Sequence, residues 1–380
     1  MSDQTAGPVE KTKAYYCVEC GKCTGICPVS RGLDYSPRRM VKRALEEPEL
    51  ELVRDKQIWN CLTCKLCSGV CPSGVDYIDF IKIVRSRAFA SGLSGSCSQG
   101  GQLNTLSRMM ATEGPTQNRN FWTEGLDIAG KGELMYFVGC LPYFDTVFED
   151  LKPGTLDIAK STVKILNAAG IRPVVSPAER CCGHDLLWSG DADAYRALAR
   201  QNIREIKRLG VRTVVTSCAE CYRTLSQDYR EMGADFEVKH ISQLAAELVE
   251  QGKLKLAASD RKVTLHDACR LGRHSGVYEQ PRDVLRKVAS LVEMPRNRIS
   301  AGCCGVGAFQ TCGAHSKRIQ MERLAEAGAV AGTLVTECPK CQIHFKCALK
   351  DKAVPGTSTP ELEIIDLASL LARSLEAGKQ

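Results

Sequence analysis

The sequence predicts a helical N-terminal domain followed by an α/β part, in which two repeated halves each contain a parallel sheet. Three observations lead to this prediction. Two dense cysteine runs near the N-terminus enclose a segment with helical spacing, strands alternate with helices after residue 133, and one pattern of five cysteines occurs twice in that later part. Such alternation is typical of parallel sheets covered by helices. A chain of 380 residues also has room for two or three domains.

The composition indicates a globular protein with metal or redox chemistry. Apolar residues make up 44% and charged residues 25% of the chain, which is normal for a soluble protein. The 21 cysteines are spread along a chain too long for a small secreted protein held by disulfides, so their clustering points to metal binding. We find no signal peptide and no membrane-spanning apolar run. We therefore expect a cytoplasmic protein, or one held at a membrane only through a partner.

Two cysteine runs characterise the N-terminal domain, and a proline follows each run. They consist of Cys17, Cys20, Cys23 and Cys27, and of Cys61, Cys64, Cys67 and Cys71. Both runs have the spacing of ferredoxins with two cubane [4Fe–4S] clusters, in which the fourth cysteine of each run binds the other cluster. The predicted ligand sets are therefore Cys17, Cys20, Cys23 and Cys71 for one cubane, and Cys61, Cys64, Cys67 and Cys27 for the second. Two zinc knuckles are the alternative, which the triple-cysteine spacing and the prolines disfavour.

The 33 residues between the runs predict a helix rather than a β-hairpin. Ser36 is a plausible N-cap and Pro37 fits the first helical position. A second helix is predicted over 77–90. We thus expect an α-helical two-cluster ferredoxin domain over residues 1–95. The basic residues of the first helix form either a solvated face or a docking patch for an acidic partner; they are Arg38, Arg39, Lys42 and Arg43.

The remaining elements follow in order. Residues 96–132 are predicted to be a linker with a short helix at about 102–112. For the first half, 133–255, the predicted strands are 134–138, 172–176 and 211–216, and the predicted helices are 154–169 and 191–209. For the second half, 256–380, they are strands 262–266 and 333–336, helices 281–290 and 315–327, and a strand followed by a helix within 362–375.

Each half contributes one set of five cysteines. The first set is Cys140, Cys181, Cys182, Cys218 and Cys221; the second is Cys269, Cys303, Cys304, Cys338 and Cys341. The copies are offset by 129 residues at their first cysteine and by 120 at their last, which predicts an internal repeat whose sites face each other across a pseudo-two-fold axis. The cysteines follow the carboxyl ends of strands, where ligands bind in such sheets. Because four thiolates complete a zinc or cubane site, a fifth predicts an unusual, ligand-rich iron–sulfur cluster.

Other polar residues near these motifs have two interpretations each. His184 follows the first Cys-Cys-Gly triplet and either donates protons near a cluster or bonds to backbone at a helix start, and the second is favoured. For His266 and Asp267, a local turn contact is favoured. Lys340 lies between two predicted ligands and is a candidate for tuning the charge of a cluster.

Three cysteines lie outside the cluster sets. Cys97 is expected to be a free thiol, and Cys312 and Cys347 are expected to be buried and inert. No G-x-G-x-x-G motif follows a strand, so we expect neither NAD nor flavin in this chain. The formal net charge of +7 does not indicate nucleic-acid binding, because negatively charged clusters would cancel much of it and no basic arm is present.

Taken together, these motifs resemble the heterodisulfide reductase family. Its fused, D-type iron–sulfur subunits carry a helical two-cubane ferredoxin and two halves with Cys-Cys-Gly motifs in this order. The resemblance covers about residues 14–375 and is carried by 181–191 and 266–274. Because both five-cysteine sets are complete, it implies two noncubane [4Fe–4S] clusters, with all ten of those cysteines as ligands at the catalytic centre.

The resemblance also implies a function. Electrons from a flavoprotein, iron–sulfur or cytochrome subunit would pass through the two cubanes to two facing noncubane clusters, which cleave a disulfide into two thiols, within a hetero-oligomeric complex. The alternative is a non-catalytic electron-transfer subunit of a larger redox complex, such as an electron-bifurcating, benzoyl-CoA reductase-type assembly. A weaker alternative is a dehydrogenase partner that feeds electrons to quinone.

Overall fold

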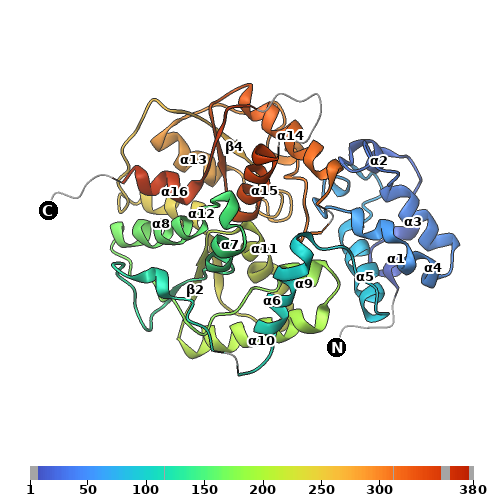
Figure 1. Cartoon of the computed structure of the whole chain (residues 1–380), viewed down its shortest axis with the longest axis horizontal. Helices are drawn as coiled ribbons and strands as arrows, with labels where there is room; N and C mark the ends of the chain where they lie inside the picture. The colour runs from blue at the N-terminus through green and yellow to red at the C-terminus, as the bar shows by residue number, and fades with distance from the viewer. Residues whose placement is uncertain (1–6, 115, 311, 352–359, 376–380) are drawn as a thin grey trace. The chain divides into compact units, whose positions relative to one another are not determined.

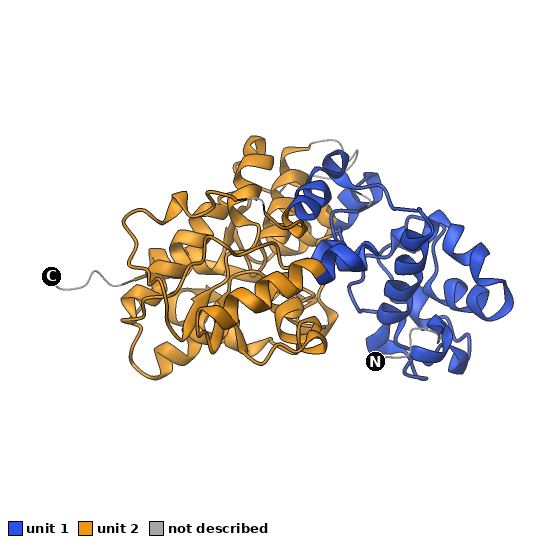
Figure 2. Ribbon diagram, turned by 90° about the horizontal axis from the view of Figure 1, so that it is seen from below, with its two compact units in different colours: residues 1–109, 183–196, 305–319 blue, residues 110–182, 197–304, 320–380 orange. Residues whose placement is uncertain are grey.

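The computed structural model describes residues 7–114, 116–310, 312–351 and 360–375. The chain falls into two compact units (Figure 2). The first unit contains residues 1–109, 183–196 and 305–319, and the second contains 110–182, 197–304 and 320–380. Two later stretches of the chain therefore complete the N-terminal unit.

The helices and strands alternate most regularly in the second unit. The helices are α1 (Pro8–Lys11), α2 (Lys22–Ile26), α3 (Pro37–Glu46), α4 (Glu49–Arg54), α5 (Tyr77–Ala90), α6 (Gln102–Ala111), α7 (Leu141–Val147), α8 (Thr155–Ala168), α9 (His184–Trp188), α10 (Ala192–Arg208), α11 (Ala219–Arg223), α12 (Ile241–Glu250), α13 (Glu279–Val288), α14 (Ala314–Gly328), α15 (Pro339–Lys350) and α16 (Leu367–Arg373). The strands are β1 (Leu134–Tyr136), β2 (Thr213–Thr216), β3 (Glu237–His240), β4 (Lys262–His266), β5 (Ser290–Leu291), β6 (Thr333–Thr336) and β7 (Glu363–Asp366).

The first unit is helical, as predicted. Helix α3 begins where the sequence indicates, because Ser36 Oγ accepts the N–H of Arg39 (3.2 Å) and Pro37 occupies the first position. Helix α5 covers the predicted range, and Asp76 caps it by accepting the N–H groups of Ile78 and Asp79. Helices α4 and α9 were not predicted, since both are too short for a clear apolar period.

The stretch 183–196 packs closely on α5 within the first unit. Gly190 has a φ of 93°, and a Cβ placed on it would lie 2.4 Å from the carbonyl oxygen of Arg85. Only glycine permits both this backbone conformation and this approach.

Replacing Gly190 by alanine should therefore lower the free energy of unfolding by roughly 2–3 kcal/mol, from left-handed strain and a backbone clash. The matched control is Gly92→Ala, because Gly92 also has positive φ but has open space around its Cβ position. We expect about 1 kcal/mol there, from strain alone. Denaturant unfolding measures both changes, and equal effects would contradict the clash.

The second unit contains two parallel sheets. The first has the strand order β1-β2-β3 and the second β5-β4-β6-β7. Leu134 pairs with Thr213 and Thr216 with His240 in the first sheet. The same element order recurs in both halves: strand, helix, helix, strand, helix, strand, helix, from β1 to α12 and from β4 to α16 with β5 added.

The predicted strand at 172–176 is wrong. Only Val174 pairs, in isolated parallel bridges with Met135 and Ala129. Pro173 lacks the N–H that a longer ladder needs. Val174 nevertheless lies beside β1 as β5 lies beside β4, so the two sheets have similar edges. The sequence analysis also missed β3, whose alternating glutamate and lysine are poor strand formers.

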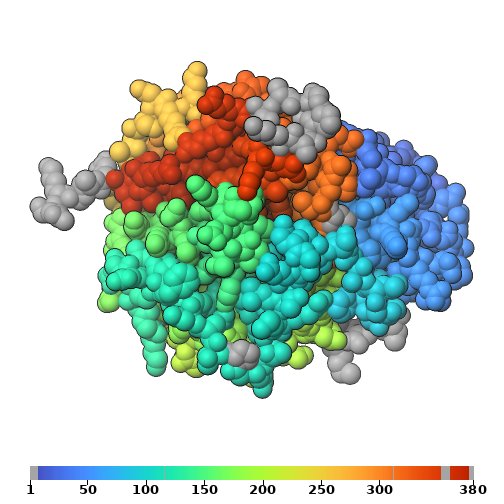
Figure 3. All heavy atoms as spheres, in the orientation of Figure 1, coloured from blue at the N-terminus to red at the C-terminus, as the bar shows by residue number. Residues whose placement is uncertain are grey.

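One hydrophobic core joins the two halves. Helix α8 packs on α16 and α12 packs on α13, and these four helices gather in one place in Figure 1. Their apolar faces supply fully buried residues such as Ile158, Val163, Leu285 and Leu371. In Figure 3 the green surface around α8 adjoins the red surface of α16. Since each half buries apolar area against the other, this core stabilises the pair rather than either half alone.

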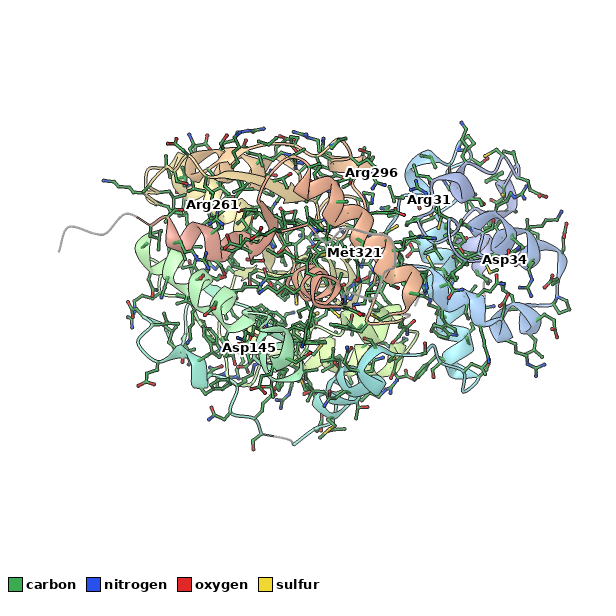
Figure 4. The ribbon with its side chains drawn as sticks, turned by 45° about the horizontal axis from the view of Figure 1, so that its top comes forward. Arg31, Asp34, Asp145, Arg261, Arg296 and Met321 are labelled. Atoms are coloured by element: carbon green, nitrogen blue, oxygen red, sulfur yellow. The ribbon has the colours of Figure 1, made fainter. Side chains whose placement is uncertain are left out.

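Polar contacts fix the halves further. Gln342, in α15, donates to the carbonyl oxygen of Pro153 (2.7 Å), and Lys346 donates to that of Lys152 (2.9 Å). Asp145, labelled in Figure 4, accepts the N–H of Thr155 (2.6 Å) and thereby caps α8.

His240 joins the end of β3 to the end of β6. Its Nδ1 accepts the N–H of Ser242 (3.3 Å) at the start of α12, and its Nε2 lies 3.2 Å from the carbonyl oxygen of Glu337. Nε2 therefore carries the proton and donates it to that carbonyl. Burial lowers the pKa of His240 to about 4, although the carbonyl of Glu337 opposes the shift.

This histidine should make the protein sensitive to acid. Its folded pKa lies below the unfolded value of about 6.5, so its contribution is complete above pH 6.5 and is lost as the pH falls toward 4. Between pH 7 and pH 5 the loss is about 2 kcal/mol. His240→Asn keeps a capping acceptor without titrating, so its unfolding free energy should fall less over that range. Chemical denaturation at both pH values tests this, and parallel losses would argue against it.

Among the described residues, no helix combines the length and the apolar character needed to span a membrane.

Candidate iron–sulfur sites

The two cysteine runs of the first unit share one backbone shape. Glu19 and Gly21 have positive φ angles of 50° and 77° in the first run, and Thr63 and Lys65 have 51° and 65° at the equivalent positions of the second. Such angles cost residues other than glycine roughly 1–3 kcal/mol. The fold accepts this strain where it curls each run around its thiols, which is typical of functional sites.

The fourth cysteine of each run lies near thiols of the other run. Burial raises the pKa of Cys27 to about 11, and the neighbouring Cys64 and Cys61 also raise it. Burial likewise raises the pKa of Cys23, to which Cys17 and Cys71 contribute.

The two runs differ in exposure. Cys20 is exposed and Cys17 is half-buried, whereas Cys61, Cys64 and Cys67 are buried. The thiols of the second run therefore lie in a medium of lower dielectric constant.

The first five-cysteine set comes together in the second unit. Cys218 follows β2 and hydrogen bonds to Cys221 in α11. The Sγ of Cys221 lies 3.4 Å from that of Cys182. A Cβ on Gly139, next to Cys140, would lie 2.9 Å from the Sγ of Cys221, so the backbone at the end of β1 approaches this thiol because residue 139 has no side chain.

The second set is connected in the same way. Its thiols form a series of hydrogen bonds that joins Cys269 to Cys303, Cys303 to Cys304, Cys304 to Cys341 and Cys341 to Cys338. All are buried except Cys269, which is half-buried like Cys140 at the equivalent position. None of the 21 cysteines forms a disulfide.

The two sets meet at their C-x-x-C motifs. The thiols of Cys218 and Cys338 hydrogen bond to each other. Glu220 and Lys340 occupy equivalent positions in the two motifs and form a buried ion pair beside this contact. The opposite charges at matching positions were visible in the sequence, but Glu220 was not singled out.

A buried carboxylate supports the backbone before Cys140. Glu179 accepts the N–H groups of Gly139 (2.7 Å) and Val138 (3.0 Å), and Arg119 pairs with it at 2.8 Å. Burial raises the pKa of Glu179 to about 7, while Arg119 opposes the rise. Sequence patterns gave no signal for this pair, because its members are 60 residues apart and belong to no motif.

Buried acids also support the backbone before Cys269. Glu337 accepts the N–H of Ala268 (3.5 Å), and burial raises its pKa well above the usual range. Asp267 forms two hydrogen bonds with the buried Arg282 (2.7 and 2.9 Å). Burial opposes ionisation of Asp267, but Arg282 outweighs it and lowers the pKa. The expected local turn contact is therefore wrong for Asp267, whose partner lies 15 residues away.

The two histidines singled out by sequence are both buried. His184 begins α9, with its Nδ1 3.0 Å from Oδ1 of Asp185, so it contacts a side chain at the helix start. His266 has an edge contact with Phe345 and lies 3.3 Å from Nε of Arg323. Burial, with Arg323, lowers its pKa to about 3, so the ring is neutral near pH 7.

The prediction for two outlying cysteines was wrong. Cys312 is exposed and Cys347 is half-buried, because they lie in the loop before α14 and in the last turns of α15. Cys97 is half-buried and accepts a hydrogen bond from Asn104 (3.1 Å).

The basic residues of α3 pair within the chain. Arg39 pairs with Asp34, Lys42 with Glu19 and Glu46, and Arg43 with Glu47 and Asp55. These pairs favour a solvated helix face over a docking patch.

Comparison with known proteins agrees with these motifs. Residues 13–75 match the family described as 4Fe-4S dicluster domain, and residues 134–226 and 263–346 match the family described as cysteine-rich domain. An uncharacterized iron–sulfur protein of Methanocaldococcus jannaschii is 29% identical over 94% of this chain and 72% of its own length. The D-type subunit of the dihydromethanophenazine:CoB–CoM heterodisulfide reductase of Methanosarcina mazei is 27% identical over 94% of this chain and 93% of its own. The EtfAB:quinone oxidoreductase of Syntrophomonas wolfei is 29% identical over 64% of this chain and 34% of its own.

The chain is thus an iron–sulfur protein that combines a 4Fe-4S dicluster domain with two cysteine-rich domains. It belongs to the heterodisulfide reductase family and has the domain order of its fused, D-type subunits.

Proposed function

We propose that this chain is an oxidoreductase subunit that carries electrons through two cubane [4Fe–4S] clusters to two noncubane [4Fe–4S] clusters, where a disulfide is cleaved. The contact between Cys218 and Cys338 carries this proposal, because it brings two complete five-cysteine sets together. Cleaving a disulfide takes two electrons, and two adjacent one-electron centres can supply them together.

The proposed cubane ligands are the crossed sets predicted from the two runs. The proximity of Cys27 to Cys64 and Cys61 supports this assignment, as does that of Cys23 to Cys17 and Cys71. In a crossed arrangement each fourth cysteine must lie with the other run.

The proposed noncubane ligands are the ten cysteines of the two sets. Their chemistry fits, because soft thiolates are the preferred ligands of iron–sulfur clusters and none is used in a disulfide. When bound, such clusters would supply single electrons and iron sites that accept sulfur. The buried surroundings of Cys182, Cys218 and Cys338 exclude water from the place where the sets meet.

The chain's own polar residues would position the sites and supply protons. The Glu220–Lys340 pair places a cation and an anion beside the Cys218–Cys338 contact, and Lys340 is the nearer candidate for donating a proton to a thiolate product. The buried ring of His184 remains a second candidate.

We also propose a hetero-oligomeric setting in the cytoplasm. The electron donor would be a flavoprotein, iron–sulfur or cytochrome subunit, and any membrane would be reached through it. The likeness to a heterodisulfide reductase subunit over nearly the whole chain supports an assembly of this kind. The exposed thiol of Cys20 suits electron entry at the first run.

The test is to purify the protein without oxygen, measure iron, sulfide and EPR spectra, and follow reduction of an added disulfide by a reduced artificial donor. We expect about sixteen irons per chain, from four sites with about four irons each, and thiol formation that depends on the donor. A zinc-loaded, EPR-silent protein would contradict the proposal.

A second candidate is an electron-transfer subunit without catalysis. The burial of eight of the ten thiols favours it, since a disulfide would need access to them. The same assay separates the two functions: full iron content with reducible clusters but no thiol formation would support the relay.

A further inference from the structure

Arg85, in α5, is a buried cation beside the second cysteine run. It is 1% exposed. Its Nη2 donates to the carbonyl oxygens of Cys61 (2.7 Å) and Trp59 (3.0 Å), and its Nε donates to that of Ile58 (3.0 Å). These acceptors are neutral, so the hydrogen bonds orient the guanidinium without cancelling its charge. Because arginine keeps its proton in proteins, the charge persists at every pH of interest.

The same guanidinium contacts the stretch that follows the first Cys-Cys-Gly triplet. Its Nη1 donates to the carbonyl oxygen of Trp188 (3.0 Å), the last residue of α9. The ring of Trp59 lies 5.5 Å from the guanidinium carbon. Arg85 therefore holds the backbone of Cys61 and the end of α9 in one place within the first unit.

A buried cation should ease reduction of a cluster next to it. An added electron makes a thiolate-bound cluster more negative, and a low dielectric constant strengthens its attraction to a nearby positive charge. Burial alone acts in the opposite direction, because it disfavours the more highly charged form. The same opposition appears at one thiol, since burial raises the pKa of Cys61 while Arg85 opposes that rise.

We propose that Arg85 is a positioning residue that raises the reduction potential of the cubane bound by Cys61, Cys64, Cys67 and Cys27. It thereby offsets the cost of burying that cubane, so that electrons move from the exposed run to the buried one. This inference rests on the cubane-binding part of the proposed function and not on disulfide cleavage.

The experiment is a potentiometric titration of the cluster-loaded protein, followed by EPR. In Arg85→Gln, which keeps N–H donors but removes the charge, we expect one cubane to lose at least tenfold in its reduction equilibrium constant, about 59 mV for one electron. The other cubane should not change. Arg85→Lys keeps the charge and should stay much closer to the wild-type potential.

Lys82→Met is the matched control. Lys82 lies on the same helix, with its Nζ 5.5 Å from the ring of Trp188, but it is partly exposed and pairs with Asp79. Solvent screens its charge, so we expect a much smaller shift.

Two results would overturn the inference alone: normal cubane signals with unchanged potentials in Arg85→Gln, or an equal shift in Arg85→Lys, which would assign the effect to hydrogen bonds instead of charge. If Arg85→Gln fails to load clusters, the comparison of Arg85→Lys with Lys82→Met still decides, because a shift in Arg85→Lys as large as tenfold would contradict a charge effect. Absence of both cubane signals from the wild-type protein would overturn the cluster assignment together with this inference.

Discussion

Replacing Cys182 by serine should abolish disulfide reduction and remove about four of the sixteen or so irons expected per chain. Cys182 is buried and lies 3.4 Å from the Sγ of Cys221, inside the first five-cysteine set. A hydroxyl is a harder and weaker ligand than a thiolate for iron in such sites. We expect a loss of roughly a hundredfold or more, above the 10–100-fold typical of changes outside the ligand shell.

Iron analysis and the donor-linked disulfide assay measure both effects. The matched control is Cys347→Ser, which changes a half-buried cysteine of α15 outside both sets. It should keep its iron and its turnover. Full iron content in Cys182→Ser, or iron loss in Cys347→Ser, would contradict the ligand assignment.

Replacing Arg119 by methionine should produce the largest loss of stability, roughly 3–5 kcal/mol. Arg119 and Glu179 are 2% and 1% exposed, so the change leaves a buried carboxylate without its cation. The pKa of Glu179, already raised to about 7 by burial, would rise further, because Arg119 now opposes that rise. The N–H anchors at Gly139 and Val138, which position the chain before Cys140, would weaken with it.

Chemical denaturation of the cluster-loaded protein tests this expectation against an exposed pair. Arg172 and Asp127 are 63% and 57% exposed, so Arg172→Met should cost about 0–1 kcal/mol. Arg119→Met combined with Glu179→Gln should recover part of the loss, since it removes the unpaired charge. Similar losses in Arg119→Met and Arg172→Met would contradict a special role for the buried pair.

Local patterns predicted much of the fold. Helix α5 matches its predicted range because its apolar spacing is clear, and β4 and β6 match because they are short apolar runs. The strand expected at 172–176 failed because one proline interrupts an otherwise apolar run. β3 escaped notice because burial against a neighbouring strand, rather than its own propensity, makes it a strand.

The candidate sites were predictable only in part. Cysteine spacing is local, so it indicates which thiols form each run or set. The groups that support them are not local: Arg119 finds Glu179 across 60 residues, and Glu220 finds Lys340 on the other half. Asp267 was expected to bond nearby, yet its partner is Arg282 in α13. Such pairs depend on how sheets and helices pack, which no single stretch of sequence specifies.

The first unit is assembled from three separate stretches of the chain, and this limits how the protein can be divided. A fragment ending at residue 109 would lack Trp188, whose carbonyl binds Arg85, and Gly307, where a side chain would collide with the carbonyl of Leu62. Insertions or deletions shortly after either Cys-Cys-Gly triplet would thus be felt at the N-terminal cysteine runs. Gene fission at the ferredoxin boundary would require new residues to replace both borrowed pieces.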